Sequence, residues 1–275
     1  MPSTLRISIA HRVAAVWMTR ANVRNAFNET TIAEMTEAFR ALGADPEVRA
    51  IVLAAEGPAF CAGADLDWMR RMAQYSDEEN RADALKLATM LRTIHDCPRP
   101  VIARVHGAAF AGGVGLVAAC DIAVAARTAE FCLTETKLGL IPATIAPYVM
   151  RAMGPQQARR YFLTAEKFDA NEAFRMGLVH GTAPADELDA TIDELLGQLM
   201  LTSANAVAEA KRLVRDLAFR PIDDAVTADT AERIAAIRRS PDGREGIASF
   251  LEKRKPRWVV EYEAMAAARD EDEEM

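Results

Sequence analysis

The chain has 275 residues and carries 33 Lys and Arg against 40 Asp and Glu, a net charge of −7 at pH 7. Its 51% apolar and 27% charged residues are typical of a folded globular protein and exclude an intrinsically disordered chain. The acidic balance excludes a non-specific nucleic-acid binder, which needs a basic face to displace counterions from phosphates. Five of the acids fall in the run 270–274, so we expect residues 261–275 to form a disordered acidic tail.

The cysteines and the N-terminus indicate the compartment. The cysteines form no C-x-x-C pair and match no zinc-ligand spacing, so we expect reduced thiols in the cytoplasm (Cys61, Cys97, Cys120 and Cys132). No apolar stretch reaches the roughly 20 residues that span a bilayer, so no membrane partner is predicted. Residues 1–28 contain arginines but no acids, as organellar transit peptides do. Apolar residues alternate over 5–9 and 13–17, however, which predicts two strands and a mature chain that begins near Met1.

The first part of the chain alternates between predicted strands and helices. After the N-terminal strand pair, Asn28 caps a helix whose apolar positions recur every three or four residues. Ser76 and Glu79 form a capping box that opens a second helix, which ends at Pro98. Continuous apolar runs predict three buried strands, with a short helix before the last of them (strands 50–54, 101–105 and 122–126; helix 113–119). Strands separated by helices predict an α/β layer.

From about residue 148 onwards the pattern becomes helical. Helical periodicity covers five segments that prolines help to separate (155–165, 185–200, 203–217, 222–239 and 242–254). We therefore expect an α/β core over residues 1–200, a helical region over 201–260 and the acidic tail over 261–275.

Two loops carry small residues directly after a predicted strand. The segment 58–65 (PAFCAGAD) follows strand 50–54, and 106–113 (HGAAFAGG) follows strand 101–105 and enters a helix. Small side chains leave backbone N–H groups unobstructed, and amides at a helix start lack an intrahelical partner and carry partial positive charge. One amide from each loop can therefore bind a developing oxyanion. Each loop alone is equally compatible with tight helix–strand packing.

These two segments carry a family resemblance. Together with four further motifs they resemble the enoyl-CoA hydratase/isomerase (crotonase) family (FCAGADL at 60–66, HGAAFAGG at 106–113 with AACDI at 118–122, RNAFN at 24–28, LGLIP at 138–142, AFRMGLV at 173–179 and FLEKRKP at 250–256). The resemblance implies a crotonase-like α/β spiral of ββα units with a C-terminal helical oligomerisation region. It also implies that the amides of Ala64 and Gly112 form an oxyanion hole for the carbonyl of an acyl-CoA thioester. CoA then belongs to the substrate, and no separate cofactor is expected.

The resemblance also identifies a candidate acid–base group. Hydratases of this family usually carry two glutamates beside the reacting double bond. One of them matches Glu135, and the other lies three residues after the oxyanion glycine, where this chain has Gly115. Glu135 lies between the apolar residues Phe131 and Leu138, so desolvation can raise its pKa towards the working pH. The alternative for Glu135 is a solvent-facing loop acid, and we expect Gly115 to serve helix packing.

A single carboxylate leaves several functions open. Glu135 can activate water and return a proton to the α-carbon, or it can shuttle a proton between carbons, as Δ3-Δ2-enoyl-CoA isomerases of the family do. A catalytically weak CoA-thioester binder is the non-enzymatic alternative. The loop 139–148 (GLIPATIAPY) looks like a bacterial branch that acts on branched, carboxylated enoyl-CoA esters. That branch includes 3-methylglutaconyl-CoA hydratase of leucine breakdown and a terpenoid-degradation counterpart, so we expect a hydratase rather than an isomerase.

The resemblance further implies where CoA binds. Its adenine and pantetheine would lie against the backbone of a loop and a turn (Arg24, Ala26, Ala62, Ala64, Asp65, Leu66, Asp67 and Gly112). Lys253 matches a residue that reaches CoA from a neighbouring subunit, although a Lys–Arg–Lys run is also typical of plain surface. We expect Asp65 to fix its own loop and His106 to be a hydrogen-bonded structural residue. The implied assembly is a homotrimer or a dimer of trimers.

A dinucleotide-binding site is the alternative from a different class. Residues 113–118 fit G-x-G-x-x-A, and Glu135 follows at the usual distance of about 20 residues. That pattern belongs in the turn between a strand and a helix, whereas seven residues separate Val105 from Gly113. The helix also ends too early, at Asp121, for a full βαβ unit, so we reject this alternative.

Overall fold

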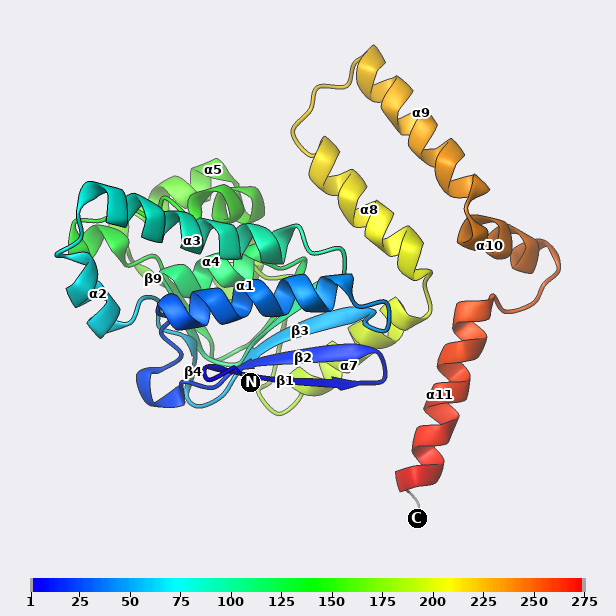
Figure 1. Ribbon diagram of the computed structural model, residues 1–275, viewed down its shortest axis with the longest axis horizontal. Coiled ribbons are helices and arrows are strands. Elements are labelled where there is room, and N and C mark those ends of the chain that lie inside the picture. The colour runs from blue at the N-terminus through cyan, green and yellow to red at the C-terminus, as the bar shows by residue number, and fades with distance from the viewer. Residues whose placement is uncertain (1, 274–275) are drawn as a thin grey trace. The chain divides into compact units, whose positions relative to one another are not determined.

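A computed structural model describes residues 2–273 of the chain. The chain divides into two compact units, one up to Asp193 and one from Glu194 (Figure 1). This boundary falls inside helix α7 (Leu188–Met200), whereas the sequence placed the end of the core after residue 200. Among the described residues, no helix combines the length and the apolar character that crossing a membrane requires.

The first unit is built on a six-stranded sheet that contains the strands predicted from apolar runs. Its strands lie in the order β1 (Leu5–Ala10), β2 (Val13–Met18), β3 (Ala50–Ala55), β5 (Val101–Val105), β7 (Ile122–Ala126) and β10 (Gly181–Ala183). β1 and β2 form the expected antiparallel hairpin, and the other neighbours pair in parallel. Every residue of β3 is buried, which explains why this strand is an unbroken apolar run rather than an alternating one.

A second sheet contains short strands that the sequence did not predict. They lie in the order β4 (Ala59–Cys61), β6 (Ala108–Phe110), β8 (Glu130–Cys132) and β9 (Lys167–Asp169). Strands of three residues are too short to display a period of two, so patterning does not detect them.

Strands of the two sheets alternate with helices along the chain. β3 and β4 precede α2 (Leu66–Met72), β5 and β6 precede α4 (Gly112–Ala119), and β7 and β8 precede the 3-10 helix η2 (Glu135–Leu138) and α5 (Ala146–Thr164). This repeat confirms the predicted α/β spiral of ββα units.

Two further helices of the first unit, α1 and α3, begin at the caps that the sequence predicts. Asn28 accepts a hydrogen bond from the Thr31 amide at the start of α1 (Glu29–Ala44). Ser76 and Glu79 form the capping box of α3 (Asp77–His95), which lies alongside α1 in Figure 1. The predicted apolar positions of α1 are all buried (Ile32, Met35, Phe39 and Leu42). A short 3-10 helix, η1 (Ala21–Val23), precedes α1, and α6 (Ala170–Arg175) precedes β10.

The second unit continues from α7 into four more helices, of which the sequence predicts the first three. They are α8 (Ala204–Leu217), α9 (Asp224–Arg239), α10 (Pro241–Leu251) and α11 (Arg257–Glu273). The side chains of Ser203, Asp223 and Ser240 cap α8, α9 and α10 by accepting backbone hydrogen bonds.

The acidic segment is helical where the structure describes it. Residues 261–273 belong to α11, and the disorder expected of the tail stays a prediction. Ala, Glu, Met and Arg, which dominate residues 261–269, are strong helix formers, and this local propensity favours a helix despite the charge that follows. The end of the predicted tail, Glu274 and Met275, lies outside the described residues.

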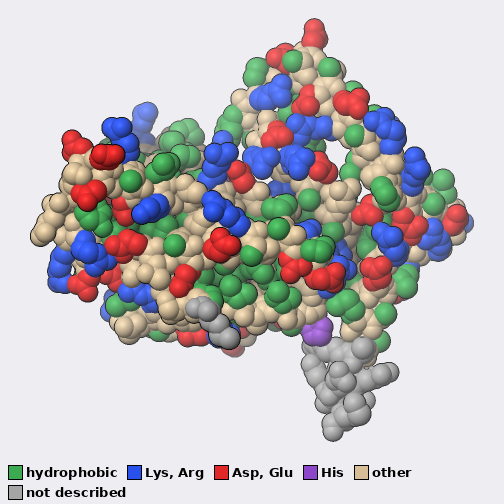
Figure 2. Space-filling view, in the orientation of Figure 1, with side chains coloured by type: hydrophobic (Ala, Val, Ile, Leu, Met, Phe, Trp, Pro, Cys, Tyr) green, Lys and Arg blue, Asp and Glu red, His purple; other side chains and the backbone are tan. Residues whose placement is uncertain are grey.

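Surface charge is mixed rather than segregated. Figure 2 shows acidic and basic side chains interspersed on the face that it draws of each unit. Several of them form exposed ion pairs, such as Arg71 with Glu29 (2.8 Å) and Arg160 with Glu166 (2.7 Å). Pairs of this kind contribute at most about 1 kcal/mol each, so buried backbone and apolar contacts determine the geometry of the interior.

Candidate functional site

The loop after β4 and the start of α4 lie in contact. β4 and β6 pair in parallel, so the loops that follow them leave the same edge of the second sheet. A Cβ atom on Gly63 would lie 3.1 Å from the Cβ of Ala111 and 3.8 Å from the nitrogen of Gly112. Gly63 has a φ of +97°, which glycine adopts without strain. The two predicted loops therefore touch through their backbones, which brings Ala64 and Gly112 together.

The amides of Ala64 and Gly112 are both free to donate. Within residues 2–273, neither amide donates a hydrogen bond to another group, and both residues are partly exposed. Gly112 is the first residue of α4, so its N–H has no intrahelical acceptor and lies at the positive end of the helix dipole. Two such amides in contacting loops can donate to one carbonyl oxygen and stabilise negative charge on it.

Ala111, directly before Gly112, has a strained backbone. Its φ is 47° and its ψ is −118°, a region that costs an L-residue about 1–3 kcal/mol. The Ala111 carbonyl accepts from the Val114 amide (2.9 Å) at the start of α4. Because the N–H and the C=O of a trans peptide point in opposite directions, the Gly112 N–H points away from the helix. Alanine carries no sequence signal for a positive φ, so sequence reasoning missed this residue.

Glu135 lies shortly after β8, the strand that pairs with β6. β6 and β8 pair in parallel, and the Ala111 amide donates to the Cys132 carbonyl (2.8 Å), three residues before Glu135. Glu135 is half-buried rather than solvent-facing, and its Oε2 accepts no hydrogen bond from the described part of the chain. Burial raises the pKa of the Glu135 carboxyl above its usual value, and a bond from its own backbone amide offsets this only in part. A raised pKa makes the carboxylate a stronger base, which suits a group that takes up and releases a proton.

Ile145 fills the space beside Gly115. A Cβ on Gly115 would lie 2.7 Å from the Cβ of Ile145 and closer still to its Cγ2, and Ile145 is only 1% exposed. Ile145 caps the start of α5, which packs against α4 and η2. The position at which the family resemblance implies a second glutamate therefore has no room for a side chain. Gly115 serves packing, as expected. Its partner Ile145 lies at the start of a different helix, so no local pattern in the sequence indicates the contact.

Asp65 and His106 have structural partners, as the sequence predicts. Asp65 caps α2 by accepting from the amides of Asp67 and Trp68, and it pairs with Arg20 (2.7 Å). Burial alone would raise the pKa of Asp65, but Arg20 and the two amides hold it below its usual value. The Nε2 of His106 donates to the Gly57 carbonyl (2.9 Å), and burial lowers the pKa of the imidazole.

The other predicted CoA contacts fall into two groups. Within the first unit, the Ala62 amide donates to the Arg24 carbonyl (3.0 Å), so the turn that contains Arg24 and buried Ala26 lies against the loop 62–67. Leu66 is 70% exposed at the start of α2, and the exposed Asp67 pairs with Arg70 on the same helix. Lys253 belongs to the second unit, where it follows α10 in a left-handed conformation.

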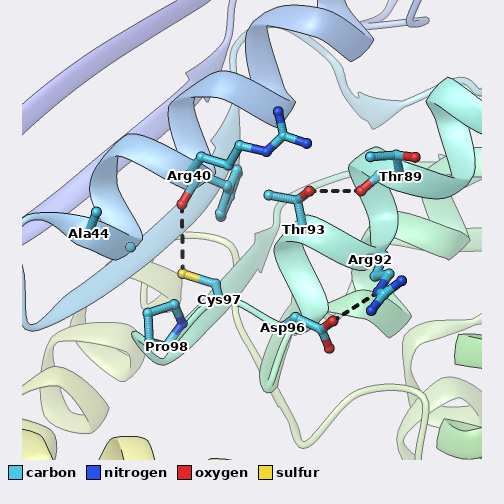
Figure 3. Close-up of a pocket in the computed structure, with 10 residues that line it drawn as sticks. Arg40, Ala44, Thr89, Arg92, Thr93, Asp96, Cys97 and Pro98 are labelled. Atoms are coloured by element: carbon cyan, nitrogen blue, oxygen red, sulfur yellow. Dashed lines mark hydrogen bonds and ion pairs between the residues drawn. The ribbon is translucent and has the colours of Figure 1, made fainter.

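A cavity of about 500 Å³ lies elsewhere, between the C-terminal ends of α1 and α3. Figure 3 shows Arg40 of α1 on the side of the cavity opposite α3, whose Arg92 points towards Asp96. Arg92 pairs with Asp96 (3.1 Å), and the Thr93 hydroxyl donates to the Thr89 carbonyl (2.8 Å). Two polar groups that line the cavity therefore already have partners within the protein. None of the predicted site residues lines this cavity. In the described part of the chain, no three His, Cys, Asp or Glu side chains gather as a metal site requires.

Comparison with known proteins agrees with the resemblance found in the sequence. Residues 8–261 match the family model described as enoyl-CoA hydratase/isomerase. The chain is 31% identical over 250 residues to the crotonyl-CoA hydratase of Syntrophomonas wolfei, covering 90% of this chain and 95% of that protein. Among solved structures, an enoyl-CoA hydratase from Shewanella pealeana aligns with a TM-score of 0.91 and 42% identity, covering 94% of this chain and 97% of that one. The enoyl-CoA hydratase of Mycobacterium smegmatis aligns at 0.88 with 35% identity, covering 93% and 99%.

The strain at Ala111 predicts that Ala111→Gly stabilises the protein. Glycine relieves about 1–3 kcal/mol of strain and loses about 0.4–1 kcal/mol through the larger entropy of the unfolded chain, so we expect a net gain of about 1 kcal/mol. Denaturant unfolding measures the change. Ala118→Gly, inside the same helix α4, is the matched control and should lose about 1 kcal/mol. If A111G and A118G lose the same unfolding free energy, the backbone of Ala111 is not strained.

The contact between Gly115 and Ile145 predicts coupled substitutions. Gly115→Ala should lose about 1–3 kcal/mol through overpacking and Ile145→Ala about 2–4 kcal/mol through the cavity it leaves. In the double variant the new methyl group enters that cavity, so unfolding measurements should give a loss clearly below the sum of the two. Gly197→Ala, where the nearest atom to a new Cβ is 3.8 Å away, is the control and should gain about 1 kcal/mol of helix propensity. Strict additivity would refute the contact.

Proposed function

Because this chain belongs to the enoyl-CoA hydratase/isomerase family, we propose that it adds water reversibly across the double bond of a 2-enoyl-CoA thioester. The observation that carries this proposal is the meeting of two free amides, at Ala64 and Gly112, beside the segment that presents Glu135. The raised pKa of Glu135 supports an acid–base role. The relatives named as hydratases support hydration as the type of reaction.

The two amides would bind the thioester carbonyl oxygen. As hydroxide adds to C3 of the enoyl group, electrons move onto that oxygen and give an enolate. The Ala64 and Gly112 amides donate more strongly to the enolate than to the neutral carbonyl. They therefore stabilise the transition state more than the bound substrate, which lowers the activation barrier. Loss of one such donor typically costs about 3–4 kcal/mol of transition-state stabilisation.

Glu135 would move the protons. Its carboxylate takes a proton from water while the water oxygen bonds to C3, and the resulting carboxylic acid then gives that proton to C2 as the enolate collapses to the ketone form of the thioester. One carboxylate is sufficient because a single proton is removed and returned. Half-burial raises the pKa of Glu135 and so makes its carboxylate a stronger base towards water.

The packing of Ile145 against Gly115 favours a second candidate, Δ3-Δ2-enoyl-CoA isomerisation. Here Glu135 would remove a proton from C2 of a 3-enoyl thioester and return it at C4, while the double bond moves into conjugation. This reaction needs only one carboxylate and no water. A catalytically weak CoA-thioester binder is the third candidate, because the second acid is absent.

The acyl group in this proposal is branched and carboxylated, as in 3-methylglutaconyl-CoA. The loop 139–148 that suggests it follows η2 directly, so it continues the segment that carries Glu135. Leu140 and Ile141 in this loop are 52% and 74% exposed and would contact an apolar branch. Lys137, exposed on η2, is a cation available for a distal carboxylate.

Subunit assembly belongs to the same proposal. We expect a homotrimer or a dimer of trimers, in which the exposed Lys253 reaches CoA bound to a neighbouring subunit. The second unit supports assembly with exposed apolar side chains (Val214, Phe219, Ile222, Phe250 and Leu251) and a groove of about 580 Å³ between α8 and α9. The proposal needs no cofactor, nucleic acid or membrane. The four free, buried cysteines fit a reducing compartment such as the cytoplasm.

Glu135→Gln should lower kcat by about 10²–10⁴-fold, because glutamine cannot carry the proton. The assay follows conjugated-thioester absorbance with a panel of straight, branched and dicarboxylic esters. Hydration of a 2-enoyl-CoA lowers this absorbance, whereas isomerisation of a 3-enoyl-CoA raises it. Glu130→Gln, whose side chain pairs with Lys167 (2.9 Å), is the control and should keep wild-type activity. Near-wild-type turnover by E135Q would refute the role of Glu135. If the wild type turns over none of the esters, the CoA-thioester binder is the remaining candidate.

The buried carboxyl also predicts how stability depends on pH. The pKa of Glu135 is raised in the folded state, so the folded protein binds this proton more tightly than the unfolded chain. Its contribution is therefore present below the usual pKa of 4.5 and is lost as the pH rises through the raised value. Unfolding of the wild type and E135Q from pH 4 to 8 should show the wild type losing stability relative to the variant.

Glu79 supplies a control of opposite sign. The Ser76 amide and hydroxyl lower the pKa of Glu79, so its contribution appears as the pH rises and is lost on acidification. The wild type should therefore gain stability relative to E79Q over the same pH range. For each variant, the measured quantity is the difference in unfolding free energy between wild type and variant as a function of pH. A change with pH in the same direction for E135Q and E79Q would contradict the burial of Glu135.

A further inference from the structure

Phe27 contacts both of the loops that carry the free amides. It lies between η1 and α1, and it is only 1% exposed. The sequence marked it solely as part of the RNAFN motif and gave it no role. Its backbone and its ring make separate contacts, one with each loop.

The backbone of Phe27 holds the loop around Ala64. The Phe27 amide donates to the Gly63 carbonyl (2.9 Å), and the Phe27 carbonyl accepts from the Asp65 amide (3.1 Å). Together these bonds form a parallel bridge opposite Ala64. The residues on both sides of Ala64 are therefore tied down, while the Ala64 amide itself remains unbonded.

The ring of Phe27 faces the other amide. A Cβ built on Gly112 would meet the tip of this ring, with Cε2 and Cε1 at 3.1 and 3.2 Å and Cζ nearer still. The ring therefore packs directly against the α-carbon of Gly112, where only glycine fits. Since a fully buried ring cannot move aside without displacing its neighbours, it limits how closely the start of α4 approaches the Ala64 loop.

Neighbouring side chains hold the ring in place. The Trp68 ring lies 6.4 Å from it, centroid to centroid, at a tilt of 54°, and Trp68 is 2% exposed. The Trp68 indole N–H donates to Asp83 of α3 (3.3 Å). A packed chain of side chains thus runs from α3 through Trp68 and Phe27 to Gly112.

We propose that Phe27 is the positioning residue that sets the spacing and orientation of the Ala64 and Gly112 amides towards one oxygen atom. Its backbone fixes one amide and its ring fixes the other, so a single residue links the two donors. This inference rests on the proposed role of these amides in binding a thioester carbonyl. Phe27 itself touches no reacting atom.

Phe27→Leu is the central test, because leucine keeps the backbone bridge and removes the ring tip. With an enoyl-CoA that the wild type hydrates, we expect kcat and kcat/KM to fall together by about 10–100-fold, with KM almost unchanged, since a misplacement near 1 Å can cost 10²-fold. Phe39→Leu, the same change at an equally buried position on α1, is the matched control. It should lower stability and leave kcat unchanged. An F27L variant with wild-type kcat would overturn the proposal.

A double variant tests the contact itself. Gly112→Ala places a methyl group against the Phe27 ring and should lose most activity, whereas F27L/G112A should recover at least about fivefold over G112A, because coupled residues are not additive. F39L/G112A should show no recovery. If the F27L and G112A effects simply multiply, the ring does not position Gly112.

An infrared measurement separates this inference from the proposed reaction. In wild-type protein, carbonyl-¹³C butyryl-CoA, which is saturated and does not react, should show its thioester stretch shifted to lower frequency by the two amides. The shift should shrink in F27L and persist in F39L. If the wild type hydrates nothing but shows this pattern, the proposed function fails and the inference stands. If F27L keeps the full shift, the inference fails, whatever reaction the wild type catalyses.

Discussion

Two stretches of backbone, Gly63 in one loop and Ala111–Gly112 in the other, touch with almost no side chain between them. A hydrogen bond to a developing charge depends on donor position within a few tenths of an ångström, and exposed side chains are too mobile to provide that precision. Backbone amides between a buried sheet and a helix start meet this requirement, because packing determines their position. Gly113 extends the same contact, since a Cβ there would lie 3.0 Å from the Cβ of Cys61. The small residues of both loops are therefore a geometric requirement of the site.

The charge chemistry of the proposed reaction rests on one side chain. Glu135 lies where desolvation disfavours its ionised form and where one of its oxygens has no protein donor. Such a carboxylate destabilises the folded state but gains basicity, which is the exchange of stability for function expected at an active site. The position of a second acid is filled by Ile145 instead. An apolar side chain at that point also lowers the local polarity, which strengthens the remaining electrostatic interactions.

Local patterns and motifs in the sequence were sufficient to predict much of the fold and to nominate the candidate site residues. The strand over residues 50–54, the Asn28 cap and the two small-residue loops were each visible in short segments, and the family motifs pointed to Ala64, Gly112 and Glu135. Contacts between distant segments left no such trace. The three-residue strands show no periodicity, an alanine at positive φ looks like any alanine, and neither Ile145 against Gly115 nor Phe27 against Gly112 can be inferred before the chain is folded. At the acidic end of the chain, charge favours disorder and local propensity favours a helix, so short-range patterns give no single answer there.

The fit of Ile145 against Gly115 has an evolutionary consequence. A chain that drifts by single substitutions cannot place a glutamate at position 115 without first emptying position 145, and emptying it alone leaves a cavity that destabilises the fold. Either first step alone is therefore unfavourable for folding. The two positions constrain each other, so a side chain at position 115 requires a compensating change at position 145.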